Sequence, residues 1–124
     1  MKVKNIQFKF ESSETSPPID KEHIESMYLD IDNAVWTMEE DKELNKKIIA
    51  NNLYIILFNS ANYQLSEGLS FFDRLKQFND ITDITIIYED DTQDIICPPY
   101  VGTHNGNLCQ EVITDDDKLV IKIG

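Results

Sequence analysis

The sequence predicts an α+β fold, in which one or two helices pack on one face of an antiparallel β-sheet. Three observations predict it: an alternating apolar pattern near the N-terminus, a continuous apolar run at Leu53–Phe58, and two hairpin-like patterns after Ile81. The amphipathic segment Ser66–Asn79 provides the firmest helix. With 124 residues, the chain is expected to form a single domain, 1–124.

The first predicted strand covers Lys2–Glu11. Its residues alternate between an apolar side and a polar side, with Ile6, Phe8 and Phe10 on the first and Asn5, Gln7 and Lys9 on the second. This period of two is typical of a strand with one buried face. Residues 11–18 are polar and end in two prolines, so we expect a loop there.

Residues 20–40 fit two patterns. Apolar residues follow helical spacing from Ile24 onward, and Asp20 is suitably placed as an N-cap, so we expect a helix that begins near Asp20. Apolar residues also alternate on both sides of Asp32-Asn33, which would indicate a hairpin. The helix leaves Leu29 and Trp36 on the wrong face, and the hairpin leaves Tyr28 and Val35 outside. The helix is the preferred interpretation, and the hairpin stays open.

The middle of the chain contains the clearest single elements. The run Leu53–Phe58 predicts a central strand buried on both faces. Ser66 is expected to cap the helix that follows, which runs to about Asn79. Its inner face would hold Leu65, Leu69, Phe72, Leu75 and Phe78.

From Ile81 onward the pattern is that of a β-meander made of two hairpins. The strands are expected at Asp83–Glu89, Gln93–Cys97, Leu108–Thr114 and Leu119–Ile123. Asp90-Asp91-Thr92 and the segment 115–118 are the expected turns, and Gly102–Asn107 is the expected loop.

The charge is strongly acidic and unevenly distributed. The chain has 11 Lys and Arg against 23 Asp and Glu, a net charge of −12. This balance argues against direct binding to nucleic acid or to an anionic membrane surface. No Lys or Arg lies between Lys76 and Lys118, whereas ten acidic residues do: Asp80, Asp83, Glu89, Asp90, Asp91, Asp94, Glu111, Asp115, Asp116 and Asp117.

The two acidic turns are the main candidate site. In a meander both turns would point to the same end of the sheet, and six carboxylates would then lie close together: Glu89, Asp90, Asp91, Asp115, Asp116 and Asp117. Such a cluster would favour a basic protein partner. Tyr100, in a predicted loop, is a candidate interface anchor. The simpler interpretation is that aspartate favours turns and keeps the surface soluble.

No catalytic or cofactor-binding motif is present, and we expect no cofactor. Neither acidic turn matches an EF-hand loop. The spacing Cys97-x6-His104-x4-Cys109 would need the remote His23 as a fourth zinc ligand, and a Cys97–His104 nucleophilic pair would lack an orienting third group. A small enzyme or metal protein built on these residues therefore remains only an alternative.

The expected location is the cytoplasm. Two cysteines do not make a disulfide scaffold, the first residues contain no apolar segment typical of a signal peptide, and no apolar run reaches the length of a membrane helix.

About the last 53 residues resemble small acidic proteins of unknown function from phages and integrative mobile elements of Gram-positive bacteria. The similarity lies in the helix running into Asn79-Asp80-Ile81-Thr82, the Tyr88-Glu89-Asp90 turn, the pair Asn107 and Gln110, and the acidic turn before Leu119–Ile123. The resemblance implies a mobile-element setting and no catalytic residues.

Together these observations predict a non-enzymatic acidic accessory protein that binds a basic surface, for example on a host nucleic-acid-binding protein. A self-associating structural module is a further alternative, and the oligomeric state is left open.

Overall fold

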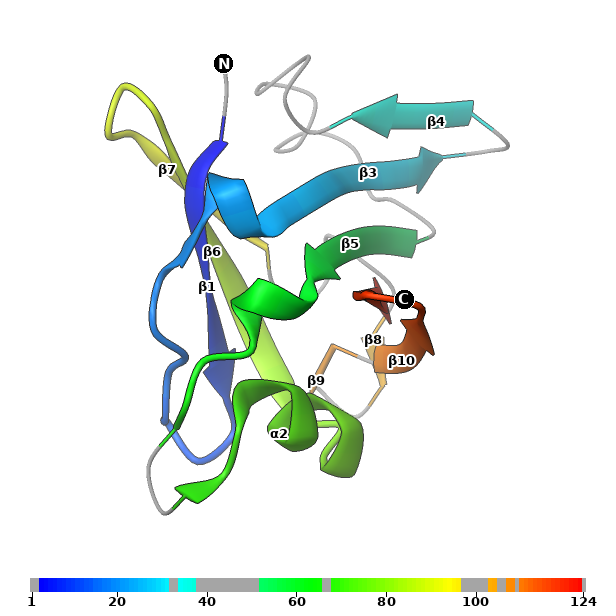
Figure 1. The fold of residues 1–124 in the computed structure, drawn as a ribbon. Coiled ribbons are helices and arrows are strands. Elements are labelled where there is room, and N and C mark those ends of the chain that lie inside the picture. The colour runs from blue at the N-terminus through cyan, green and yellow to red at the C-terminus, as the bar shows by residue number, and fades with distance from the viewer. Residues whose placement is uncertain are drawn as a thin grey trace.

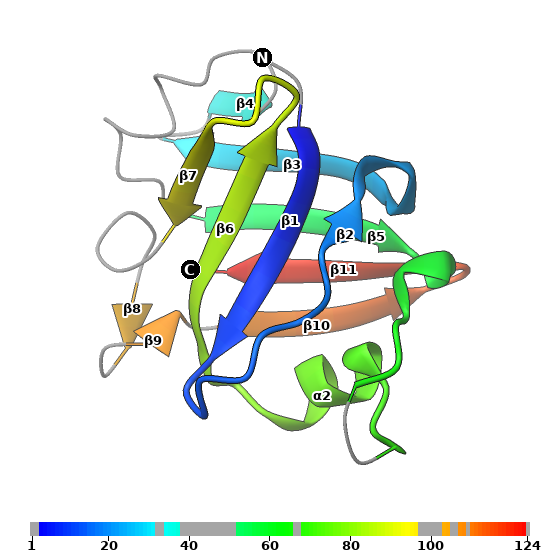
Figure 2. The ribbon, with the colours of Figure 1, turned by 90° about the vertical axis from the view of Figure 1, so that its left-hand side faces the viewer.

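The computed structural model describes residues 3–31, 34–37, 52–65, 68–96, 103–104, 107–108 and 110–123. Within them the chain forms two antiparallel sheets that pack face to face around one hydrophobic core (Figure 1). Figure 2 looks onto the first sheet and shows the strands of the second running crosswise behind it. The expected antiparallel architecture is confirmed, but it is divided between two layers and contains little helix.

The first sheet is built around β1 (Val3–Phe10) and β6 (Ile81–Tyr88), which pair along almost their whole length. Its order is β2-β1-β6-β9-β8, and β7 also pairs with β6. The remaining strands are β7 (Gln93–Ile96), β2 (Ile19–Asp20), β8 (Thr103–His104) and β9 (Asn107–Leu108). The alternation predicted for β1 is confirmed, because Ile6, Phe8 and Phe10 are at most 1% exposed.

The second sheet has the order β10-β11-β5-β3-β4. Its strands are β3 (Ile24–Ile31), β4 (Ala34–Thr37), β5 (Asn52–Phe58), β10 (Gln110–Asp115) and β11 (Lys118–Ile123). β5 is central, as predicted, but it is not buried on both faces. Leu53, Ile55 and Leu57 are fully buried, whereas the alternate residues are only half-buried, because the other sheet covers one side of β5 alone.

The helix expected near Asp20 is wrong, and the hairpin alternative is right. A short 3₁₀ turn, η1 (Lys21–His23), leads into β3, which pairs with both β4 and β5. Pairing with β5 extends from Ile24↔Leu57 to Asp30↔Asn52, with a register shift between Ile24 and Ser26, and supplies backbone partners along one edge of β3. Tyr28, which the hairpin leaves outside, stacks on Tyr54 of β5 at 4.8 Å between ring centroids.

The helix after β5 is shorter than predicted. A second 3₁₀ turn, η2 (Asn59–Ala61), follows β5, and α2 covers only Phe71–Gln77. Among the described residues before it, Gln64 bridges to Ser70, and Gly68 has a φ of 78° in the left-handed region, so they do not extend α2. The expected cap, Ser66, lies outside the described residues.

Part of the predicted inner face of the helix is confirmed, since Phe72 and Leu75 are buried and Leu65 packs with the core. Phe78, however, is 48% exposed, because the chain has already left the helix there and adopts an extended conformation. α2 lies at one end of the two-layered body instead of covering a sheet face (Figures 1 and 2). Among the described residues, α2 at the end of the layers therefore takes the place of the predicted helices on one face.

Ser70 caps α2, since its hydroxyl accepts a hydrogen bond from the Asp73 backbone N–H at 3.2 Å. We expect Ser70→Ala to lower the free energy of unfolding by about 1 kcal/mol, because one N-terminal amide of the helix loses its partner. Urea denaturation measures the change. Ser60→Ala, at an exposed serine of η2, is the control and should change the unfolding free energy by less than about 0.5 kcal/mol.

Candidate interaction surface

The two acidic turns belong to different sheets and do not meet. The first joins β6 to β7 in the first sheet, and the second joins β10 to β11 in the second sheet. Figure 2 shows them in different regions of the molecule. The predicted meander is wrong because β7 and β10 do not pair: β7 lies beside β6 in the first sheet, and β10 lies beside β11 in the second. The six carboxylates therefore do not form one cluster.

Ion pairs and a local hydrogen bond engage all three carboxylates of the first turn. Glu89 pairs with Lys21 at 2.7 Å, and Asp91 pairs with Lys4 at 2.9 Å. The Asp90 carboxylate accepts a hydrogen bond from the Thr92 backbone N–H at 3.0 Å. Two of the three charges have a cationic partner and the third shapes the turn, which favours the simpler interpretation here.

The second turn joins a different group of acidic residues. Lys118 Nζ lies 2.8 Å from Glu25 Oε1 at the start of β3, and the Asn59 N–H donates to the backbone carbonyl of Asp117 at 2.9 Å. The hydrogen bond to Glu25, followed by the charges of Asp117 and Asp115, raises the pKa of Lys118. We call Glu25 and Asp115–Asp117, arranged around Lys118, the acidic corner. It combines four carboxylates with a single ammonium group.

Apolar side chains cross the outer side of the second sheet beside this corner. Ile113, Val120 and Ile56 are cross-strand neighbours on β10, β11 and β5, and they form a row that we call the apolar row. Ile113 is 48% exposed, and the other two are half-buried. The stacked Tyr28 and Tyr54 lie on the same side. By contrast, β1 directs Asn5, Gln7 and Lys9 to the outer side of the first sheet.

A small pocket adjoins the edge of the second sheet, between the end of α2 and β10. It measures about 170 Å³ and is lined by Leu75, Lys76, Gln77, Phe78, Asn79 and Val112. Leu75 and Val112 form its apolar part together with the exposed ring of Phe78, and polar atoms make up the larger part of its surface. It is large enough for one aliphatic side chain.

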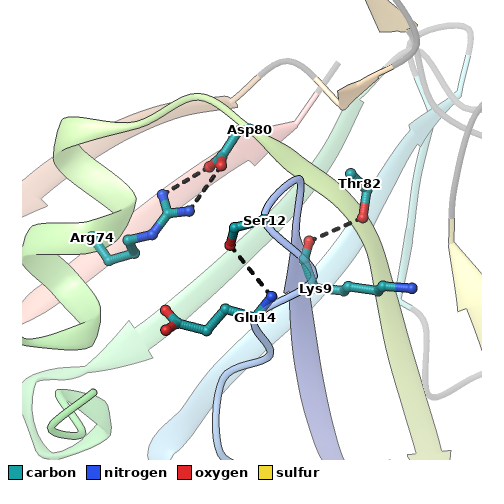
Figure 3. A network of polar contacts seen from close by, with 6 residues as sticks. All are labelled: Lys9, Ser12, Glu14, Arg74, Asp80 and Thr82. Atoms are coloured by element: carbon teal, nitrogen blue, oxygen red, sulfur yellow. Dashed lines mark hydrogen bonds and ion pairs between the residues drawn. The ribbon is translucent and has the colours of Figure 1, made fainter. Parts of the chain in front are cut away.

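Arg74 holds Phe78 at this pocket. Its two terminal nitrogens donate to the two carboxylate oxygens of Asp80, each at 2.8 Å (Figure 3). The guanidinium carbon lies 4.2 Å from the ring centroid of Phe10 and 4.5 Å from that of Phe78. The hydrogen bond with Asp80 raises the pKa of Arg74, so the guanidinium stays charged. The end of α2 is thus tied to the start of β6.

A second pocket, of about 400 Å³, lies beside the loop after β1. It is lined by Gln7, Glu14, Thr15, Ser16, Pro17, Gln64 and Leu65. The only buried hydroxyl there is that of Ser16, which accepts a hydrogen bond from the Phe8 N–H and donates to the Pro17 carbonyl. Both bonds hold the loop in place, so this hydroxyl is not poised as a nucleophile.

The polar pair of His23 and Tyr63 was not predicted from the sequence. His23 Nδ1 lies 2.7 Å from the Tyr63 hydroxyl and links η1 to the segment after η2. Burial raises the pKa of Tyr63, so its phenol stays neutral at physiological pH and is a weak nucleophile. Forty positions separate the two residues, and no spacing rule connects them.

Several predicted candidates cannot be placed. Tyr100, Cys97 and Cys109 lie outside the described residues, and of His104 only the backbone, in β8, is described. In the part of the chain that the structure describes, no three His, Cys, Asp or Glu side chains group closely enough to hold a metal ion. No described helix has the length and apolar character needed to span a membrane.

Comparisons with protein-family models, curated proteins and solved structures give no match. The acidic corner, the apolar row and the pocket beside β10 are therefore interpreted from their own geometry.

Proposed function

We propose that this chain is a non-enzymatic binding protein that docks on a basic protein through the outer side of its second sheet. One observation carries the proposal: the exposed acidic corner and the apolar row lie on the same sheet face, with Asp115 two residues from Ile113 on β10. An apolar centre bordered by charge is the usual composition of a protein interface. The net charge of −12 would speed association with a basic surface at low salt.

A nucleic-acid-binding protein is the partner class we favour. Such proteins present grooves rich in Lys and Arg that bind the phosphate backbone, and an acidic surface competes for the same groove. The resemblance of the last 53 residues to proteins of phages and integrative elements supports a mobile-element setting, in which a host protein would be the target. A cytoplasmic location is part of the proposal.

The test compares two triple variants that remove the same charge from different turns. Asp115→Asn/Asp116→Asn/Asp117→Asn should reduce the association rate with a basic partner by about tenfold at low salt, because steering charge is lost at the contact. Asparagine preserves the turn, since Asp116 has a φ of 48°, which asparagine tolerates. The partner is captured from a lysate of the source organism and its binding kinetics are measured at two salt concentrations.

The matched control is Glu89→Gln/Asp90→Asn/Asp91→Asn in the first turn. This variant has the same net charge as the variant of the second turn but leaves the proposed contact unchanged. Its association rate should therefore fall by no more than about twofold. Equal losses in both variants would mean that only total charge matters. If the association rate changed neither with the salt concentration nor with the replacement of Asp115, Asp116 and Asp117, an electrostatic contact at the second turn would be refuted.

A further inference from the structure

β10 is the terminal strand of the second sheet among the described residues. An edge strand directs the N–H and C=O groups of every second residue away from its sheet. Asp115 and Lys118 form the pair that closes a two-residue turn, and such a closing pair exchanges both of its backbone hydrogen bonds. By alternation, Val112 and Thr114 are the residues whose backbone groups face outward along the free edge.

The side chains on the outer side of β10 have a simple charge pattern. Glu111, Ile113 and Asp115 follow one another at alternate positions, and all three are exposed. Lys118, the cross-strand neighbour of Asp115, donates its hydrogen bond to Glu25 instead. A strand added beside β10 would therefore be matched by a basic residue, an apolar residue and a second basic residue at its own alternate positions.

The other side of β10 offers the small pocket. Val112 faces it together with Leu75 and Phe78. A residue paired with Val112 would point to the same side of the sheet, and the volume of about 170 Å³ suits one aliphatic side chain. Main-chain pairing would supply affinity, and the pocket would supply selectivity.

We propose that the free edge of β10 binds an extended segment of a basic protein as an added antiparallel strand. The segment has the pattern basic, any, apolar, aliphatic, basic, with the aliphatic residue in the pocket beside Phe78. This inference rests on the proposed function and specifies its mode of docking. In the antiparallel register that pairs Ile113 with itself, a second copy of the chain would set Glu111 opposite Asp115 twice, so that register is unfavourable.

The test uses the unchanged protein and three synthetic peptides. The parent is acetyl-Ser-Lys-Thr-Val-Leu-Lys-Ser-amide, whose Thr and Leu would pair with Thr114 and Val112. One derivative is N-methylated at Thr and Leu, whose N–H groups would face β10, and the other at Val and the second Lys, whose N–H groups would face away. We expect the first derivative to bind about tenfold more weakly than the second, as judged by fluorescence anisotropy at low salt.

A pair of protein variants tests the charge pattern. Glu111→Gln/Asp115→Asn should weaken binding of the parent peptide about fivefold, whereas Glu89→Gln/Asp91→Asn, with the same change in charge, should leave it within about twofold. Equal binding of both N-methylated peptides would overturn strand addition, and so would no binding of the parent at about 1 mM. Neither result would affect the capture experiment. There, failure to capture any partner whose binding depends on salt would refute the proposed function itself.

Discussion

Replacing Phe8 with alanine is expected to lower the free energy of unfolding by about 3–5 kcal/mol. Phe8 is fully buried on the inner side of β1, and its ring centroid lies 5.3 Å from that of Phe71 at the start of α2. Alanine would leave a cavity where the first sheet meets the helix. A domain of this size is stabilised by about 5–15 kcal/mol, so the variant would lose a large share of its stability. Urea denaturation followed by far-ultraviolet circular dichroism measures the loss.

Lys9→Ala is the matched control for Phe8→Ala. Lys9 is the next residue of β1 and is exposed on the opposite side, so its removal should cost less than about 0.5 kcal/mol. Phe8→Leu should fall between the two, because leucine fills part of the cavity. Similar costs for alanine at both positions would contradict the placement of Phe8 in a core shared by the two sheets.

The elements that the sequence predicted correctly are those with a local signal. The alternation that defines β1 lies within ten residues, and the hairpin of β10 and β11 is marked by three consecutive aspartates between two apolar runs. Each signal depends on side-chain periodicity and turn chemistry over a short stretch. No knowledge of a distant partner is needed to read them.

The segment that forms β3 and β4 shows where local signals fail. Its apolar residues fit a helix and a hairpin about equally. Asp20 is suitably placed as a helix N-cap, which favours the helix in a prediction from sequence. In the structure Asp20 makes no side-chain capping bond, and β5 provides the backbone partners that the strand needs. Tertiary pairing thus overrides local propensity, as it often does for strands.

The acidic candidate site was mispredicted for a related reason. A hairpin pattern carries no information about which strand lies beside the hairpin: β6 and β7 join β1 in the first sheet, whereas β10 and β11 join β5, some 60 positions earlier in the chain, in the second. The predicted juxtaposition of the two turns therefore fails. The acids that surround Lys118 include Glu25, whose position becomes clear only when β3 is known to be a strand beside β5.

Replacing Arg74 with alanine is the second change with a large expected effect, a loss of about 3 kcal/mol of unfolding free energy. Arg74 is a buried charge, with its side chain 9% exposed, and it binds both oxygens of Asp80. Without it, the Asp80 carboxylate loses its cationic partner while keeping only 19% exposure. The residual exposure of Asp80 places the cost near the lower end of the range for broken buried pairs.

Lys76→Ala removes the same charge from the same helix and should cost less than about 0.5 kcal/mol, because Lys76 is exposed. Arg74→Lys separates charge from geometry, since lysine keeps the cation but cannot form the two parallel bonds or the flat stack between Phe10 and Phe78. If Arg74→Lys restored full stability, charge alone would hold the end of α2. We expect it to restore less than half of the loss, because the planar guanidinium is what joins Asp80 to both rings and so fixes Phe78 beside the edge of β10.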